Sequence, residues 1–229
     1  MIELNSTNKI EEYKQEFDEH GVVRVFDFLT ESSATQLSQH VANDVLYKNA
    51  FSLNNENKEA SDEEISNLQP QQRRELYQAI YQLAGQGVGF LYGRNSVSAN
   101  ADKLIQQIHQ QLNSENCVSL IKQISGNDKI SYADGQVTRY RVGDFLTRHS
   151  DNIPGETRQI AYVLGLSPIW HPDWGGLLQF FLKDGTPQMS YAPVYNSLTL
   201  FDVNKVHSVT AVAPFSPQSR YSITGWFRE

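Results

Sequence analysis

Two histidines and an aspartate are spaced so that they could share one metal ion. His149 and Asp151 are two residues apart in the segment FLTRHSD, and side chains at positions i and i+2 of a strand point to the same side. His207 comes much later, at the start of the β-forming segment HSVTAV. Two imidazoles and one carboxylate with other coordination positions open favour Fe(II), with room for a bidentate cosubstrate and O2. Zinc with the same ligands is also chemically possible, and a surface His–Asp pair without metal remains an alternative.

Arg220 separates these alternatives, because it begins the strongly β-forming segment RYSITGWF. A guanidinium at the back of a barrel pocket matches a carboxylate, such as the distal one of 2-oxoglutarate. Ser222 has the same strand parity and could add a hydroxyl there. A hydrolytic zinc site has no need of that cation, although Arg220 could instead pair with a structural carboxylate.

The first half of the chain is expected to form mainly helices that support this site. A β-branched run predicts one strand, apolar residues at three- and four-residue spacing predict helices, and Thr30 and Pro70 suit helix starts. A stretch rich in Asn, Glu and Ser predicts an exposed loop. In order, the predicted elements are a strand at 21–29, a helix at 31–43, a loop at 52–69 and helices at 70–83, 100–112 and 115–125.

Residues 129–229 instead predict a β-core. Short alternating or β-branched stretches are separated by Gly-, Pro- and Asp-rich breaks, a spacing typical of a sandwich or barrel and above all of a jelly roll. The predicted strands are 129–133, 136–142, 145–149, 159–166, 176–182, 197–203, 207–212 and 220–227. The expected fold class is therefore α+β, with a helical region at 1–128 packed on a β-core at 129–229 within a single domain.

Composition narrows the function classes and the compartment. The 229 residues carry 19 Lys and Arg against 26 Asp and Glu, which argues against a nucleic-acid or membrane-surface binder. There is no apolar run long enough to cross a membrane and no signal-peptide pattern at the start of the sequence. The one cysteine, Cys117, lies at helical apolar spacing and is expected to be buried; a reducing cytoplasm is the expected location.

Four ordered motifs resemble one known family. TRYRVGDFLTRHSD, GGLLQFF, His207 and RYSITGWF are together similar to the Fe(II)/2-oxoglutarate dioxygenase superfamily, specifically its prolyl-hydroxylase branch. The resemblance covers about residues 137–228, and GVVRVFDFL with the helix after it resembles the usual N-terminal entry to that fold.

The resemblance implies a double-stranded β-helix and assigns roles to individual residues. His149, Asp151 and His207 would bind iron, and Arg220 would bind the C5 carboxylate of 2-oxoglutarate. The other implied positions are Tyr140 and Thr138 beside the cosubstrate, Leu178 and Trp226 near the metal and cosubstrate, and Arg158 in contact with substrate. Many relatives carry a second tyrosine where this chain has Gly165, which would remove a hydrogen bond to the cosubstrate or enlarge the pocket.

The implied reaction hydroxylates an unactivated C–H bond with release of succinate and CO2, and the branch points to a prolyl residue of a protein or peptide. Three alternatives stay open: a hydroxylase of a free amino acid or other small metabolite, a catalytically silent β-barrel binding module, and a zinc hydrolase. His171 is the spare ligand candidate if His207 does not bind metal. The oligomeric state is also open.

Overall fold

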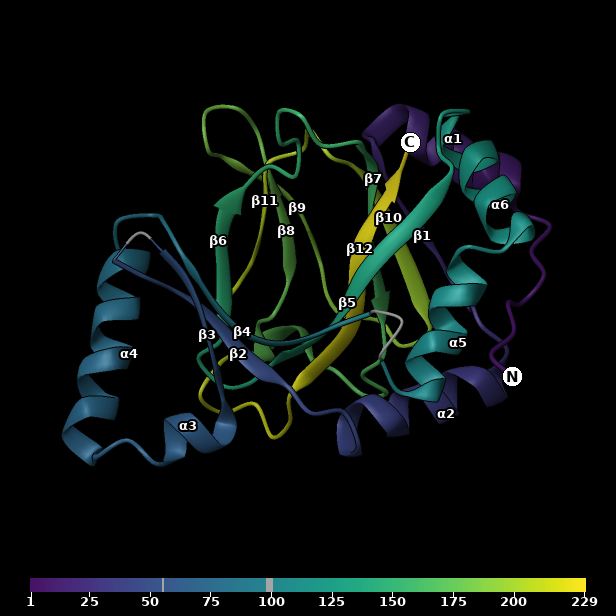
Figure 1. The fold of residues 1–229 in the computed structure, drawn as a ribbon. Coiled ribbons are helices and arrows are strands. Elements are labelled where there is room, and N and C mark those ends of the chain that lie inside the picture. The colour runs from purple at the N-terminus through teal and green to yellow at the C-terminus, as the bar shows by residue number, and fades with distance from the viewer. Residues whose placement is uncertain (55, 98–100) are drawn as a thin grey trace.

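The computed structural model describes residues 1–54, 56–97 and 101–229. A curled antiparallel sheet forms the centre, with α1, α2, α5 and α6 on one side and α3 and α4 beside the other end (Figure 1). In the described residues no helix combines the length and the apolar character needed to span a membrane. The helices are α1 (Ile10–His20), α2 (Glu31–Asn43), α3 (Asp62–Ser66), α4 (Pro70–Ala84), α5 (Lys103–Leu112), α6 (Glu115–Ser125) and the short 3-10 helix η1 (Pro172–Trp174).

The strands join in the order β1-β10-β7-β12-β5-β4-β6-β11-β8-β9, and the β2–β3 hairpin attaches through β2 to β4. Many neighbours in this order, such as β1 and β10 or β12 and β5, are distant in the chain, so much of the sheet depends on long-range pairing. The strands are β1 (Val22–Val25), β2 (Lys48–Leu53), β3 (Glu56–Ser61), β4 (Phe90–Ser96), β5 (Tyr132–Tyr140), β6 (Phe145–His149), β7 (Arg158–Gly165), β8 (Leu178–Phe181), β9 (Pro187–Tyr191), β10 (Ser197–Asp202), β11 (His207–Val209) and β12 (Arg220–Arg228).

The expected helices are present close to their predicted bounds, except that residue 100, the predicted start of one helix, lies outside the described residues. Pro70 occupies the first turn of α4, and the Ser114 side chain accepts a hydrogen bond from the Cys117 amide at the start of α6. Gly126 ends α6 in the left-handed conformation, with φ 65°, which glycine adopts without steric cost. Cys117 is fully buried in a core cluster that includes residues of both the helices and the β-core, as predicted.

The prediction of a loop at 52–69 is wrong, because much of this segment has regular secondary structure. The segment contains the end of β2, then β3 and α3, and the Ser61 and Glu64 side chains cap the start of α3 reciprocally. Most of β3 is solvent-exposed. Polar composition therefore indicated exposure correctly, but backbone pairing of β2 with both β3 and β4 supplies the regular structure.

Within 129–229 the β prediction holds, with two changes. The stretches predicted at 129–133 and 136–142 form one strand, β5, and β9 was not predicted. Asp134 and Gly135 are turn-forming residue types, but here they continue β5. A Cβ at Gly135 would lie 2.4 Å from the Tyr162 hydroxyl and 3.0 Å from the Thr224 carbonyl oxygen. Glycine is needed there for close packing, not for a turn.

Candidate active site

His149, Asp151 and His207 meet at one point in the barrel. His149 ends β6 and His207 begins β11, and these two residues are directly paired in the sheet. The Nε2 atoms of His149 and His207 lie 3.6 Å from Oδ1 and Oδ2 of Asp151, respectively. One donor atom from each residue lies within 4.8 Å of the others, so the three side chains form a group able to hold one metal ion.

Backbone carbonyls orient both imidazoles. Nδ1 of His149 lies 3.0 Å from the Thr147 carbonyl oxygen, and Nδ1 of His207 lies 3.0 Å from that of Lys205. When each Nδ1 donates its proton to a carbonyl, the lone pair is on Nε2, which faces Asp151. Such partners fix ring orientation and tautomer in metal sites.

The protonation states also suit a cation. Burial, together with the charge of His149, lowers the pKa of His207 to about 4, so its imidazole is neutral at physiological pH. Burial alone would raise the pKa of Asp151, but the adjacent imidazoles of His149 and His207 outweigh it and lower that pKa. A neutral imidazole and an ionised carboxylate are the forms that coordinate metals.

A cavity of about 550 Å³ extends from these ligands to Arg220, within the usual range for small-molecule sites. Arg220 is 4% exposed, and among the residues that the structure describes, no side chain or backbone group accepts a hydrogen bond from its Nε or Nη1. Its guanidinium carbon lies 5.2 Å from the centre of the Tyr140 ring. Unpaired buried donors are costly, and a carboxylate bound in the cavity would satisfy them.

Strand pairing places the other predicted cosubstrate residues beside Arg220. Tyr140 is directly opposite Arg220, and Thr138 is opposite Ser222, across β5 and β12. Tyr140 and Thr138 line the cavity. Ser222 is fully buried and is not among the lining residues; its hydroxyl lies 2.8 Å from that of Thr138.

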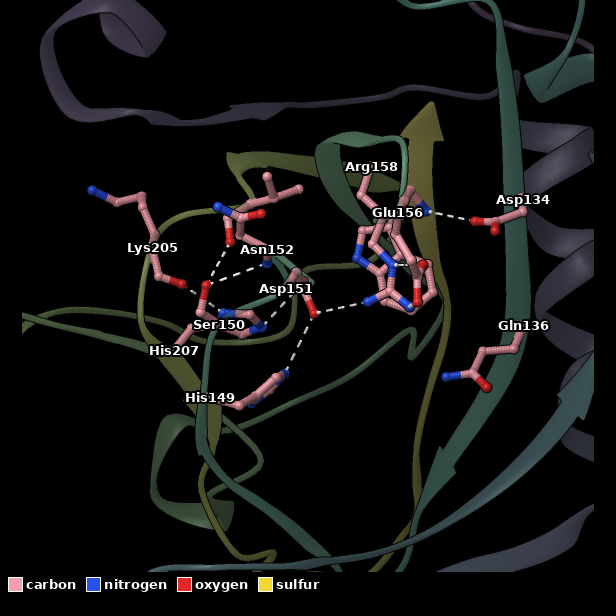
Figure 2. A network of polar contacts seen from close by, with 12 residues as sticks. Asp134, Gln136, His149, Ser150, Asp151, Asn152, Glu156, Arg158, Lys205 and His207 are labelled. Atoms are coloured by element: carbon pink, nitrogen blue, oxygen red, sulfur yellow. Dashed lines mark hydrogen bonds and ion pairs between the residues drawn. The ribbon is translucent and has the colours of Figure 1, made fainter. Parts of the chain in front are cut away.

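Leu178 and Trp226 line the same cavity, as does Arg158, whose guanidinium carbon stacks 3.6 Å from the centre of the Trp226 ring. Nη1 of Arg158 is 3.9 Å from Oδ1 of Asp151 (Figure 2). His171 is not a lining residue; it precedes η1 with its side chain 60% exposed. Of the two histidine candidates for the third ligand, only His207 is in the metal group.

The expectation that Gly165 enlarges the pocket is wrong. Gly165 does not line the cavity, and a Cβ there would lie 2.1 Å from the Val194 carbonyl oxygen. The space that a larger side chain would need is filled by backbone. Glycine at this position therefore permits a close approach of two chain segments.

Several lining residues were not predicted: Tyr92 and Arg94 of β4, Gln136 of β5 and Thr224 of β12. Two of them carried a usable signal, because Gln136 shares strand parity with Thr138, and Thr224 shares it with Arg220. The two residues of β4 carried none, since pairing of β4 with β5 and β6 does not follow from the local sequence.

Comparison with known proteins agrees with this geometry. Residues 135–228 match the model of the 2OG-Fe(II) oxygenase superfamily. Prolyl 3-hydroxylase OGFOD1 of Mus musculus is 35% identical over 114 residues, 47% of this chain and 20% of that protein. Prolyl 3,4-dihydroxylase OGFOD1 of Ostreococcus tauri is 31% identical over 141 residues, 56% of this chain and 27% of that protein. The chain thus spans only about a fifth to a quarter of these relatives.

Solved structures share the fold over nearly the whole chain. A prolyl-4-hydroxylase of Pseudomonas putida has a TM-score of 0.62 at 19% identity, covering 96% of this chain and 99% of that one. A Trichoplax adhaerens prolyl hydroxylase, in complex with a hypoxia inducible factor peptide fragment, has a TM-score of 0.63 at 18% identity, covering 98% and 94%. The expected double-stranded β-helix is thereby confirmed.

The superfamily uses Fe(II), 2-oxoglutarate and O2, and the donor set of His149, Asp151 and His207 fits such a metal. All three ligand candidates and Arg220 lie inside the segment that matches the family model. Residues 135–228 are therefore similar to the 2OG-Fe(II) oxygenase superfamily, and part of the chain is similar to a prolyl 3-hydroxylase.

Proposed function

We propose that the protein is a 2-oxoglutarate-dependent dioxygenase that hydroxylates a prolyl residue in a protein or peptide, with release of succinate and CO2. The main observation behind the proposal is that one cavity contains both a candidate cation site and a candidate anion site. Three metal-ligating groups lie at one end, and a buried guanidinium lies at the other, with no hydrogen-bond partner for its Nε or Nη1 among the described residues. A short dicarboxylate that chelates a metal and extends a second carboxylate fits this arrangement, whereas a zinc hydrolase has no use for Arg220.

Each cavity residue has a role in the proposal. His149, Asp151 and His207 would hold Fe(II), and Arg220 would bind the distal carboxylate through a charge-assisted fork. The iron, when bound, supplies the oxidative decarboxylation of 2-oxoglutarate by O2 and the transfer of hydroxyl to carbon.

The remaining residues would orient the cosubstrate and exclude water from it. Tyr140 offers a hydroxyl beside Arg220, and Ser222 holds the Thr138 hydroxyl in place. Leu178 and Trp226 provide walls of the cavity.

A prolyl residue in a polypeptide is proposed because the relatives are a prolyl 3-hydroxylase and a prolyl 3,4-dihydroxylase. Val88 and Ile153 line the cavity and are 55% and 42% exposed, so apolar groups are available to contact a chain that enters from solvent. Arg158, proposed to touch substrate, lines the same cavity. A cytoplasmic location is part of the proposal, and cell fractionation would test it.

The test combines cosubstrate turnover with product analysis. Protein loaded anaerobically with Fe(II) and 2-oxoglutarate is exposed to O2, and succinate is quantified with and without proline-containing peptides. We expect succinate from the wild type, more of it with a substrate peptide, and one added oxygen atom on a peptide proline by mass spectrometry. His149→Ala should abolish both signals.

The outcomes separate the alternatives. Turnover of free proline or a metabolite without any polypeptide would replace the prolyl-residue substrate by a small molecule. Absence of succinate together with absence of Fe(II) and 2-oxoglutarate binding would indicate a silent binding module.

A further inference from the structure

A network of alternating charges extends from Asp151 away from the metal group (Figure 2). Arg158 stacks on Trp226 and points Nη1 toward Asp151 at 3.9 Å. That separation is too long for a hydrogen bond. The Arg158 guanidinium is therefore near the metal-ligand carboxylate without binding it directly.

Glu156 accounts for the position of Arg158. Its Oε2 accepts a hydrogen bond from Nε of Arg158 at 2.7 Å, and its Oε1 accepts one from Nη2 at 3.3 Å. The same carboxylate is anchored by Nη2 of Arg228 at 3.1 Å, and Nε of Arg228 donates to Asp134 at 2.6 Å. Two arginines thus hold Glu156, and Glu156 occupies two donor groups of Arg158.

Arg158 has two carboxylates within reach, and the choice between them affects metal binding. A guanidinium that formed a bidentate pair with Asp151 would use both oxygens of a metal ligand. It would also place a positive charge against an incoming cation. Held by Glu156, Arg158 leaves Asp151 free to coordinate a metal.

We propose that Glu156 is a positioning residue that restrains Arg158 from pairing with Asp151 and so keeps Asp151 available to the metal. The inference rests on the proposed function, in that His149, Asp151 and His207 hold the metal. It gives two neighbouring residues opposite effects. Loss of the Glu156 charge releases Arg158 toward Asp151 and weakens metal binding, whereas loss of the Arg158 charge does not weaken it.

The full chain, freed of metal, is titrated with Mn²⁺ alone, and bound Mn²⁺ is measured by electron paramagnetic resonance. Glu156→Gln should raise the Kd about tenfold, the lower end of the range for residues that orient metal ligands. Arg158→Gln should bind Mn²⁺ at least as tightly as the wild type. Glu12→Gln, the same charge change on the exposed surface of α1, should bind like the wild type.

The double variant separates restraint of Arg158 from simple attraction between Glu156 and the metal. If Glu156 acts through Arg158, Glu156→Gln/Arg158→Gln should bind like Arg158→Gln alone. An equal loss of affinity from Glu156→Gln in both backgrounds would overturn the inference, and so would unchanged affinity in the single Glu156→Gln variant.

Two further results complete the test. If Glu156→Gln does not fold, as judged by circular dichroism, Glu156→Asp takes its place, and unchanged affinity in that variant overturns the inference. If the wild type binds no Mn²⁺, the proposed metal site is wrong and the inference fails with it. If the wild type binds Mn²⁺ and the Glu156 variants bind equally well, only the inference fails.

Discussion

At one end of the cavity the His149 and His207 imidazoles face Asp151 and lie against backbone carbonyls. At the other end Arg220 is buried, and two of its nitrogens, Nε and Nη1, have no hydrogen-bond partner in the part of the chain that the structure describes. The first group is preorganised: its rings are already turned toward the place where a cation would bind. Burial of the Arg220 guanidinium carries a desolvation cost, which a bound anion would offset. One cavity thus combines a stable binding end with an end that destabilises the ligand-free protein.

The largest expected effect comes from removing a ligand at the metal end. If metal binding contributes on the order of 10 kcal/mol, loss of one of three ligands in His149→Ala should cost about 3–4 kcal/mol, a Kd increase of several hundredfold. Mn²⁺ titration measures it. His171→Ala, an exposed histidine outside the cavity, is the matched control; an equal loss there would refute the ligand assignment.

Acid should affect the metal end through His207. Its pKa is 6.5 ordinarily and about 4 in the folded protein because of burial, so between these pH values the unfolded chain binds the additional proton. The free energy of unfolding of metal-free protein should therefore fall as the pH falls from 6.5 to 4, by roughly 3 kcal/mol from this residue. Urea unfolding at stepped pH measures it, and His207→Asn should remove that part of the slope.

Asp144, a second buried group, has the opposite pH dependence. Burial raises its pKa from 3.8 to about 6, so the folded state binds the additional proton between these values and acid stabilises the protein. Asp144→Asn should make the acid destabilisation by His207 steeper. An unchanged pH profile in both variants would contradict these protonation states.

Replacing Arg220 should weaken 2-oxoglutarate binding but stabilise the ligand-free protein. Arg220→Met should weaken 2-oxoglutarate binding about a hundredfold, the equivalent of one or two charge-assisted hydrogen bonds. The same substitution should raise the free energy of unfolding of the ligand-free protein by about 1–2 kcal/mol, because an apolar side chain replaces an unpaired buried cation.

Isothermal titration and urea unfolding measure the two effects. Arg24→Met is the control, since Arg24 has hydrogen bonds to Thr199 and the Ala192 carbonyl and its loss should destabilise. If Arg220→Met also destabilised the ligand-free protein, the contrast between the two ends would fail.

The smallest effect is expected at the hydroxyl pair beside Arg220. Thr138→Val removes a buried hydrogen bond to Ser222, which should lower the free energy of unfolding by about 1 kcal/mol and weaken 2-oxoglutarate binding only a few-fold. Thr138→Ser, which keeps the hydroxyl, should restore both. A loss of 2-oxoglutarate affinity as large as that of Arg220→Met would mean that the anion end depends on this hydroxyl as much as on the cation.

Strand parity predicted which neighbouring site residues lie together, and the resemblance to a known family supplied the other candidates. His149 and Asp151 were placed together by a two-residue spacing, and the same parity aligned Arg220 with Ser222 and Tyr140 with Thr138. The helices at 31–43 and 70–83 followed from apolar periodicity and their first residues. These features each depend on a few neighbouring residues, and tertiary contacts reinforce them.

Only the tertiary structure decided features that join distant segments. It formed the β2–β3 hairpin from a polar stretch, filled the space beside Gly165 with the Val194 carbonyl, and brought Glu156 to Arg228 and Arg228 to Asp134. Strand register and close packing determine such contacts, and neither is encoded in the spacing of nearby residues. The local sequence therefore determined which neighbouring side chains share one face of a strand, and the fold decided which of them line the cavity and which charges surround them.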